Sequence, residues 1–356
     1  MDIRELLKSA VETGASDVFI VAGRPVSCRL NNSIIKNSED RLMPADTESM
    51  VKQIYELAGN RDMKKFLASG DDDFAFAIPG LSRFRVNAYM QRGTLSAVVR
   101  IITFELPNYQ ELMIPDSIME IQNLSKGLVL VTGPAGSGKS TTLSCIVDAI
   151  NKNQEKHIIT LEDPLEYLHA HKKSIISQRE ISVDTEGYVP ALRAALRQSP
   201  DVILLGEMRD YETIQIAMTA AETGHLILST LHTIGAANTI DRIIDAFPAE
   251  QQRQIAIQLS LVIRGVVSQQ LVPSVDGKMV PAFEIMTVTP AIRNMIRENK
   301  VPQIDGIVYS SDTPEMVSMD NSLYRLVKEG KITAQTALAY AVNGEMLARK
   351  LGVRAL

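Results

Sequence analysis

Residues 133–140 read Gly-Pro-Ala-Gly-Ser-Gly-Lys-Ser and match the pattern GxxxxGK[ST]. An apolar run, Leu128–Thr132, leads into this loop, and a segment with helical character begins at Ser140. Glycines let several backbone N–H groups converge on one phosphate, and the following helix adds the positive end of its dipole. The pattern therefore predicts a nucleotide-phosphate site made of Gly133, Pro134, Ala135, Gly136, Ser137, Gly138, Lys139, Ser140 and Thr141. The alternative is a glycine loop that only joins a strand to a helix.

Short apolar runs recur from about residue 116 onward, separated by stretches of helical character. They are Leu128–Thr132, Ile158–Leu161, Val202–Leu205, Leu226–Ser229 and Ala282–Ile285. Runs without alternation are typical of strands buried on both faces, as in a parallel sheet with crossover helices. From residue 289 onward the pattern predicts short helices only. The expected fold class is therefore α/β.

The run at 202–205 continues through Gly206 to Glu207. Hydrolysis of a nucleotide needs a carboxylate that orients or deprotonates the attacking water. A buried strand that emerges at an acid is where a P-loop fold places this group, so Glu207 is the candidate catalytic base. Gly206 is expected to let the backbone approach the phosphates closely. The alternative for Glu207 is an ordinary exposed acid at a strand end.

A second acidic group, at Glu162, Asp163 and Glu166, follows the run at 158–161. Carboxylates of this kind hold Mg²⁺ through water or orient a nucleophilic water. We expect Glu162 and Asp163 to hold Mg²⁺ together with the Ser140 hydroxyl, and Glu166 to serve catalysis. The alternative is a charged turn interrupted by Pro164.

Two histidines, His225 and His232, bracket the run Leu226–Thr230. Because they are seven residues apart, a regular strand places them on opposite faces, which disfavours a shared metal site. His232 is a candidate sensor of the γ-phosphate. The alternative for both is a histidine satisfied by ordinary hydrogen bonds.

The first hundred residues predict a small α+β module. A helix is expected at Ile3–Thr13, and the alternation at Arg83–Tyr89 predicts a strand with apolar residues on one face and arginines on the other. The three acids at Asp71–Asp73 are expected to form a solvated turn. Prolines at 107 and 115 indicate a linker, and the stretch beginning at Thr103 is included in it.

Bulk composition limits the function classes. The formal charge of the 356-residue chain is −5, which argues against general binding of nucleic acid. The only cysteines, Cys28 and Cys145, lack a nearby ligand pair, so a disulfide framework or a zinc site is not expected. No apolar run reaches the length of a membrane span, and the N-terminus does not read as a signal peptide. A cytoplasmic protein is the expectation.

Taken in order, these elements resemble the secretion ATPase superfamily, which serves type II secretion and type IV pili. The family pattern is a Walker A loop, an acidic box, an atypical Walker B segment ending in Gly-Glu, and a histidine box. The corresponding segments here are Gly133–Ser140, Ile159–Tyr167, Asp201–Asp210 and Thr223–Thr233. The likeness extends over nearly the whole chain and includes Gly14–Asp17, Pro79–Asn87 and Leu192–Gln198. Ala135 departs from the family's usual threonine.

The resemblance implies a PAS-like α+β domain at 1–105, a linker at 106–115, a RecA-like P-loop ATPase core at 116–288 and a helical region at 289–356. Within that last region, Ala291–Glu298 reads Ala-Ile-Arg-Asn-Met-Ile-Arg-Glu, which closely matches the signature AIRNLIRE of the family's retraction motors. On a helix, Ala291, Ile292, Met295 and Ile296 share an apolar face, with Arg293 and Arg297 elsewhere. The alternative is an ordinary amphipathic helix.

The resemblance also implies a mechanism. Family members look like ring hexamers that hydrolyse ATP with Mg²⁺, and Arg83, Arg85 and Arg100 are the candidates for neutralising charge on the phosphates. The implied function is type IV pilus retraction, through a platform protein of the inner membrane and, indirectly, the pilin fibre. The chain is then expected at the cytoplasmic face of that membrane without spanning it. Alternatives are a pilus-assembly or type II secretion ATPase, an accessory retraction ATPase, a nucleic-acid motor and a non-hydrolysing scaffold.

Overall fold

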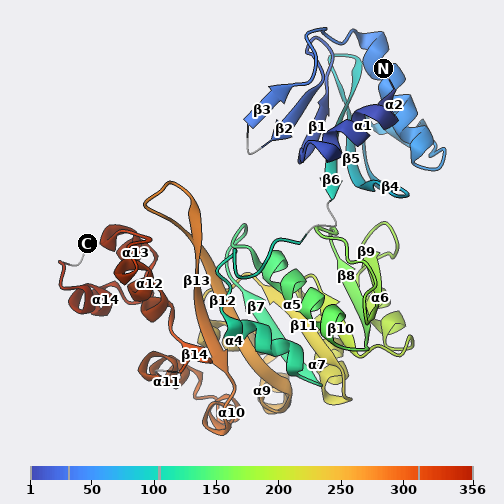
Figure 1. Ribbon diagram of the computed structural model, residues 1–356. Coiled ribbons are helices and arrows are strands. Elements are labelled where there is room, and N and C mark those ends of the chain that lie inside the picture. Colours follow the sequence, from blue (N-terminus) through green and yellow to red (C-terminus); the bar gives the residue numbers. More distant parts are fainter. Residues whose placement is uncertain (1, 31–32, 103–105, 312, 355–356) are drawn as a thin grey trace. The chain divides into compact units, whose positions relative to one another are not determined.

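The computed structural model describes residues 2–30, 33–102, 106–311 and 313–354 (Figure 1). The chain forms two compact units. The first consists of residues 1–105 with Glu166–Leu168, and the second of Leu106–Leu165 and His169–Leu356. Residues 103–105, which begin the predicted linker stretch, lie outside the described residues.

The first unit is an antiparallel sheet with helices packed on it, in the strand order β3-β2-β1-β6-β5-β4. Its core contains residues from the sheet and from the helices. This is the α+β module that the sequence predicts. The elements are α1 (Ile3–Glu12), β1 (Asp17–Ile20), β2 (Ser27–Leu30), β3 (Ser33–Lys36), α2 (Pro44–Leu57), α3 (Lys64–Ser69), β4 (Asp71–Ile78), β5 (Ser82–Gln91) and β6 (Thr94–Ile102).

Alternation decides which face of β5 is buried. Phe84, Val86 and Ala88 are fully buried, whereas Arg83 and Arg85 lie on the other face and are partly exposed. The predicted strand is therefore confirmed.

The expected solvated turn at residues 71–73 is wrong, because these acids begin β4. The carboxylate of Asp72 is buried and accepts hydrogen bonds from the Arg61 guanidinium at 2.9 and 3.1 Å and from the Tyr55 hydroxyl at 3.0 Å. These partners come from segments that precede the strand and compensate the carboxylate for its lost hydration.

The second unit is built on an eight-stranded sheet in the order β14-β13-β12-β7-β11-β10-β8-β9. Strands β12 to β9 of this order run parallel, and β13 and β14 add antiparallel pairs at one edge. The strands are β7 (Gly127–Thr132), β8 (His157–Glu162), β9 (Ile175–Glu180), β10 (Val202–Leu205), β11 (Leu226–Leu231), β12 (Ile263–Pro273), β13 (Met279–Thr287) and β14 (Met316–Val317).

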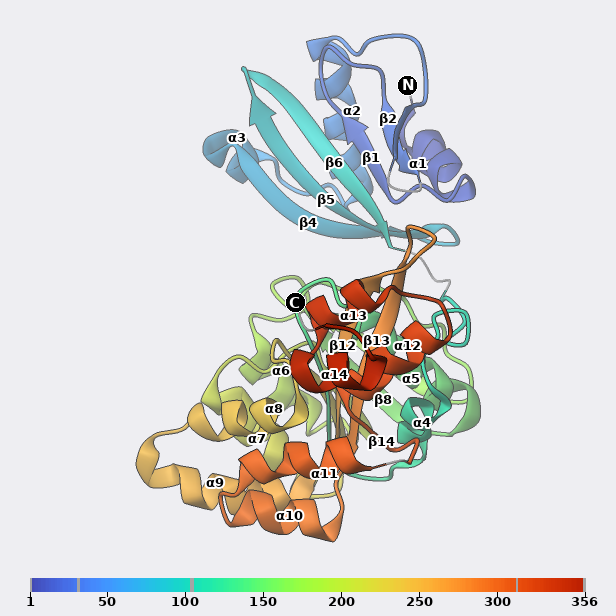
Figure 2. The same cartoon turned by 90° about the vertical axis from the view of Figure 1, so that its left-hand side faces the viewer.

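Helices cover both faces of this sheet (Figures 1 and 2). In β7, Leu128 and Leu130 enter a core shared with α6 to α11, while Val129 and Val131 enter one shared with α4 and α5. This explains the apolar runs without alternation. The helices are α4 (Asp116–Met119), η1 (Glu120–Asn123), α5 (Lys139–Asn153), α6 (Tyr188–Ala195), α7 (Tyr211–Glu222), α8 (Ala236–Asp245), α9 (Ala249–Val262), α10 (Pro290–Arg297), η2 (Val301–Gln303) and α11 (Ile304–Ser310).

Three further helices, α12 (Met319–Lys328), α13 (Ala334–Tyr340) and α14 (Gly344–Leu351), pack against one another beside the β12–β13 hairpin (Figure 2). The prediction of helices only after residue 289 is wrong in one detail, because β14 pairs with β13. In α10, Ile292 and Ile296 are fully buried, but Ala291 is exposed and leaves the predicted apolar face. Within the described ranges, no helix combines the length and apolarity needed to cross a bilayer.

Candidate nucleotide site

The predicted phosphate, acidic and histidine segments all follow parallel strands of the second unit. Thr132 of β7 pairs with Leu231 of β11, and Leu205 of β10 pairs with Ser229 of β11 and Leu161 of β8. The residues that follow these strands therefore emerge at one edge of the sheet. Crevices at the carboxyl ends of parallel strands are where open α/β sheets bind ligands. The sheet register thus brings four separate sequence segments to one place.

The glycine loop at 133–138 encloses the amino group of Lys139. This ammonium donates hydrogen bonds to the carbonyls of Gly133 and Pro134, both at 2.9 Å, and the residue is 8% exposed. Gly133 has φ +141°, and a Cβ atom there would lie 2.1 Å from the carbonyl oxygen of Gln269. Only glycine fits this position. The loop is therefore shaped before any phosphate enters it.

Gln269 of β12 supports the loop from the neighbouring strand. Its side-chain oxygen accepts a hydrogen bond from the Thr142 hydroxyl at 2.8 Å, and its amide nitrogen would lie 2.9 Å from a Cβ on Gly138. Neither β12 nor β9 was predicted as a strand. The signal available for β12 was two short apolar runs, Val266–Val267 and Leu271–Val272, on either side of Ser268, Gln269 and Gln270.

Glu207 emerges just after β10 and is largely buried, with its side chain 13% exposed. Its carboxylate lies 2.6 Å from the Nε of Arg209 and 3.6 Å from the Nε2 of His232. The hydrogen bond with Glu207 raises the pKa of Arg209 above its usual value. The Thr230 hydroxyl donates to the Gly206 carbonyl at 2.5 Å, which connects the segment after β10 to β11. Sequence reasoning missed Arg209, although it lies two residues from the predicted base.

The two acidic segments meet around the hydroxyl of Tyr188, at the start of α6. Burial raises the pKa of Tyr188, and the negative charges of Glu207, Asp163 and Glu162 raise it further. A Cβ on Gly206 would lie 2.7 Å from this hydroxyl and 3.4 Å from the Cα of Glu162. Gly206 therefore lets β10 lie close to the end of β8 and to Tyr188, a residue with no role in the sequence analysis.

The remaining predicted residues belong to the first unit. Glu166 is exposed and falls with the first unit, as do the three arginines. In that unit Arg85 pairs in register with Arg100, which pairs with Asp17. The Asp17 carboxylate accepts a hydrogen bond from the Nε of Arg100 at 2.9 Å, while the Arg100 side chain stays 66% exposed. Asp17 thus fixes the direction of Arg100, a role that sequence reasoning did not assign.

The oxygen donors predicted for Mg²⁺ fit its chemistry. Mg²⁺ is bound by one or two carboxylates together with substrate phosphates and waters. Glu162 is the last residue of β8, and Ser140 lies in the first turn of α5, after β7. Strands β7 and β8 end at the same edge of the sheet. Among the described residues, no group of three or more histidine, cysteine or acidic side chains is arranged to hold a metal alone. Ser140, Glu162 and Asp163 supply the hydroxyl and carboxylate oxygens that Mg²⁺ takes together with phosphates.

Comparison with known proteins identifies the family of the chain. The sequence pattern of the family described as Type II/IV secretion system protein matches residues 1–349. The chain belongs to this family. Of its relatives, the Type IV pilus retractation ATPase PilT of Pseudomonas aeruginosa is 43% identical over 337 residues, which cover 95% of this chain and 97% of that protein. The Type IV pilus ATPase PilU of the same organism is 39% identical over 355 residues, covering 99% and 92%.

A solved structure of the pilus retraction motor PilT with bound ADP is also similar to this secretion-family chain. The two share 43% identity and a TM-score of 0.89, over 98% of this chain and 99% of that one. The family and the α/β fold class predicted from the sequence are therefore confirmed.

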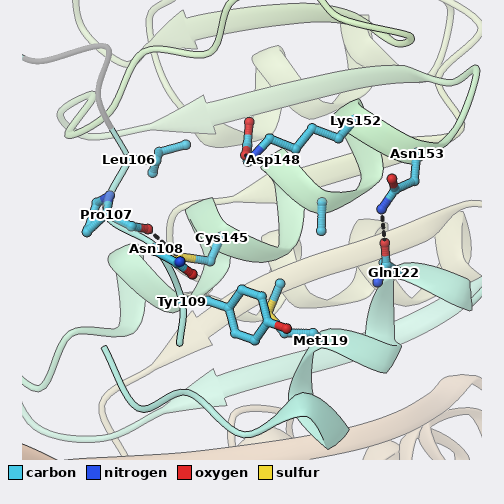
Figure 3. A pocket seen from close by; sticks show the side chains of 11 residues that line it. Leu106, Pro107, Asn108, Tyr109, Met119, Gln122, Cys145, Asp148, Lys152 and Asn153 are labelled. Atoms are coloured by element: carbon cyan, nitrogen blue, oxygen red, sulfur yellow. Dashed lines mark hydrogen bonds and ion pairs between the residues drawn. The ribbon is translucent and has the colours of Figure 1, made fainter. Parts of the chain in front are cut away.

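In this family member, residues 106–109 border a cavity of about 470 Å³ together with η1 and α5 (Figure 3). The Cys145 thiol donates to the Pro107 carbonyl at 3.8 Å, and Asn153 donates to Gln122 at 2.7 Å. Burial raises the pKa of Cys145 to about 11, so this thiol stays protonated and unreactive. The start of the predicted linker therefore packs against α5, the helix that follows the phosphate loop.

His169, in the loop after the acidic segment, predicts a pH dependence of stability. Its buried Nδ1 makes no hydrogen bond with described residues, and burial lowers its pKa to about 4. An unfolded histidine takes up a proton near pH 6.5, so the free energy of unfolding decreases as pH falls from 6.5 towards 4, by roughly 3 kcal/mol. Urea unfolding at pH 7, 5 and 4 should show a smaller decrease in His169→Gln than in the unmodified protein.

The exposed Lys173 in the same loop supplies the control, Lys173→Gln. This variant should keep the pH dependence of the unmodified protein. Equal pH dependence of the free energy of unfolding in all three proteins would contradict the assignment.

Proposed function

We propose that this chain is an ATPase that powers retraction of type IV pili. The observation that carries the proposal is the convergence of the phosphate loop, Glu207 and His232 at one edge of the parallel sheet. The register of β7, β11 and β10 supports it, as does the 3.6 Å distance between His232 and the Glu207 carboxylate. The relatives named as retraction and pilus ATPases supply the biological setting.

In the proposed reaction, backbone N–H groups of the loop and the Lys139 ammonium bind the outer phosphates of ATP. Glu207 orients the attacking water and accepts its proton. His232, beside this carboxylate, responds to the presence of the γ-phosphate. Because Arg209 holds Glu207 at 2.6 Å, the carboxylate keeps a defined direction. Hydrolysis then releases ADP and phosphate.

Ser140, Glu162 and Asp163 are the residues we propose to hold Mg²⁺ at the phosphates. Bound Mg²⁺ neutralises charge that develops on transferring phosphoryl groups. Glu166 and the arginines at positions 83, 85 and 100 remain proposed catalytic residues, on the strength of the family resemblance. Domain limits at 105, 115 and 288 likewise remain proposals.

The mechanical part of the proposal is a homo-hexamer that acts on a platform protein at the cytoplasmic face of the inner membrane, and through it on the pilin fibre. The segment at 291–298 favours retraction over assembly. The second candidate is the accessory retraction ATPase of the family resemblance, since a relative named only as a type IV pilus ATPase also aligns with 99% of this chain.

The proposal predicts an ATP-dependent assembly. Measured by size exclusion with light scattering, the purified chain should reach six times the mass of one chain with ATP, and it should release phosphate steadily. The same measurement without nucleotide is the control. A persistent monomer with no turnover would remove the motor function.

An experiment in cells distinguishes a retraction motor from an assembly motor. A strain of the source organism that lacks this chain should still carry surface pili but fail to retract them, as scored by labelled-fibre microscopy. Loss of the fibres themselves would favour an assembly motor instead, and retention of partial retraction would favour the accessory role.

A further inference from the structure

A buried carboxylate occurs in the middle of β13. Glu284 is 7% exposed and lies between the buried residues Phe283 and Ile285. Within the described ranges no lysine or arginine forms an ion pair with it. A charge in such surroundings is expensive unless hydrogen bonds replace its hydration. The partners of Glu284 must therefore explain why an acid occupies this strand.

These partners are the first backbone N–H groups of two different helices. One carboxylate oxygen of Glu284 accepts from Ala236, the first residue of α8, at 2.7 Å. The other accepts from Met319, the first residue of α12, at 3.3 Å. First-turn N–H groups have no acceptor within their own helix, and the helix dipole favours a negative charge beside them. One side chain thus anchors both helix starts.

The start of α8 is connected to the nucleotide site. His232 precedes Ala236 by four residues, and the Gly235 between them donates its N–H to the Ser268 hydroxyl at 3.0 Å. Ser268 is the register partner of Glu284 across β12 and β13, and it also pairs with Thr132, the residue before the phosphate loop. A displacement of the His232 segment would therefore pull directly on Glu284.

The start of α12 is connected to the rest of the C-terminal region. Asp320, its second residue, accepts hydrogen bonds from the N–H groups of Val342 and Asn343, at 2.8 and 3.0 Å. Asn343 in turn caps α14. Beside Glu284, a cavity of about 390 Å³ lies between α11, α12 and the start of α14. This open volume gives the helices room to shift when the carboxylate moves.

We propose that Glu284 is a positioning residue that couples the nucleotide-sensing segment around His232 to the C-terminal helices α12–α14. It holds the starts of α8 and α12 on its two oxygens, so that a change at the γ-phosphate is transmitted to α12. The inference rests on the proposed ATPase function and on His232 as sensor. It makes the C-terminal helices an output of nucleotide state.

Glu284→Gln tests the coupling, because glutamine keeps the shape but has only one accepting oxygen. The amide nitrogen of the glutamine is a donor, so one of the two helix N–H groups would face another donor and lose its acceptor. We expect kcat for ATP hydrolysis to fall about tenfold, within the range of measured coupling effects, while KM for ATP stays within twofold. In hydrogen exchange, a non-hydrolysable ATP analogue should still change protection at 236–245, but no longer at 319–328.

Glu329→Gln, at the exposed C-terminal end of α12, is the matched control and should behave as the unmodified protein. If Glu284→Gln does not fold, as judged by thermal melting, Ser268→Ala removes the neighbouring anchor and should lower kcat with KM unchanged. Unaltered kcat with a normal exchange response at 319–328 would overturn the coupling. So would a raised KM with kcat unchanged. An unmodified protein without hydrolysis would instead overturn the proposed function.

Discussion

Replacing Lys139 with alanine is expected to lower ATP turnover by roughly 10²–10³-fold or more, the size of effect seen when one preorganised charge-stabilising donor is removed. The ammonium of Lys139 lies inside the glycine loop, 2.9 Å from each of two carbonyls. Without it, no cation of the loop itself is directed at the outer phosphates. Steady-state release of phosphate at saturating ATP measures the effect.

Lys152→Ala is a matched control, because this lysine is on the same helix α5, is 57% exposed and pairs with Asp148. Its turnover should stay near that of the unmodified protein. Since Lys139 is buried and also supports the loop, Lys139→Gln should be measured beside Lys139→Ala, with thermal melting to confirm folding. A folded Lys139 variant that keeps more than a tenth of normal turnover would remove the phosphate-binding role of this loop.

Much of the second unit was predictable, because its signals are local. A glycine loop between an apolar strand and a helix has few other readings, and acids or histidines directly after apolar runs must emerge at a strand end. Parallel pairing then places Glu207 and His232 together without further information. The strands β7, β8, β10 and β11 all appear where the apolar runs predicted them.

What the sequence did not indicate depends on partners far along the chain. Gln269 meets Thr142 across 127 positions, and nothing near either residue announces the contact. β12 escaped prediction because polar residues interrupt its apolar run. One of them, Gln269, lies against the phosphate loop at Gly133 and Gly138. Asp72 was misplaced for a similar reason. Its neighbours suggest a solvated turn, while its burial is compensated by Arg61, eleven positions earlier.

Glu207→Gln should retain ATP but hydrolyse it roughly 10²–10⁴-fold more slowly, which is the contribution of a general base. Glutamine preserves the size of the side chain and can still lie against Arg209, yet it cannot accept the proton of the attacking water. Binding of a fluorescent ATP analogue should stay within a few-fold of normal, because the phosphate loop is intact. Single-turnover measurements separate this loss of chemistry from loss of binding.

Glu212→Gln is the control, since Glu212 is a half-exposed acid on α7 that pairs with Arg193. Glu162→Gln should be measured beside Glu207→Gln, because both carboxylates lie near the Tyr188 hydroxyl and raise its pKa. If Glu207→Gln turned over near the normal rate while Glu162→Gln did not, the base would belong to the acidic segment after β8. Glu207, paired with Arg209, would then have only a structural role. Loss of turnover in Glu207→Gln with ATP still bound leaves Glu207 as the group that acts on water.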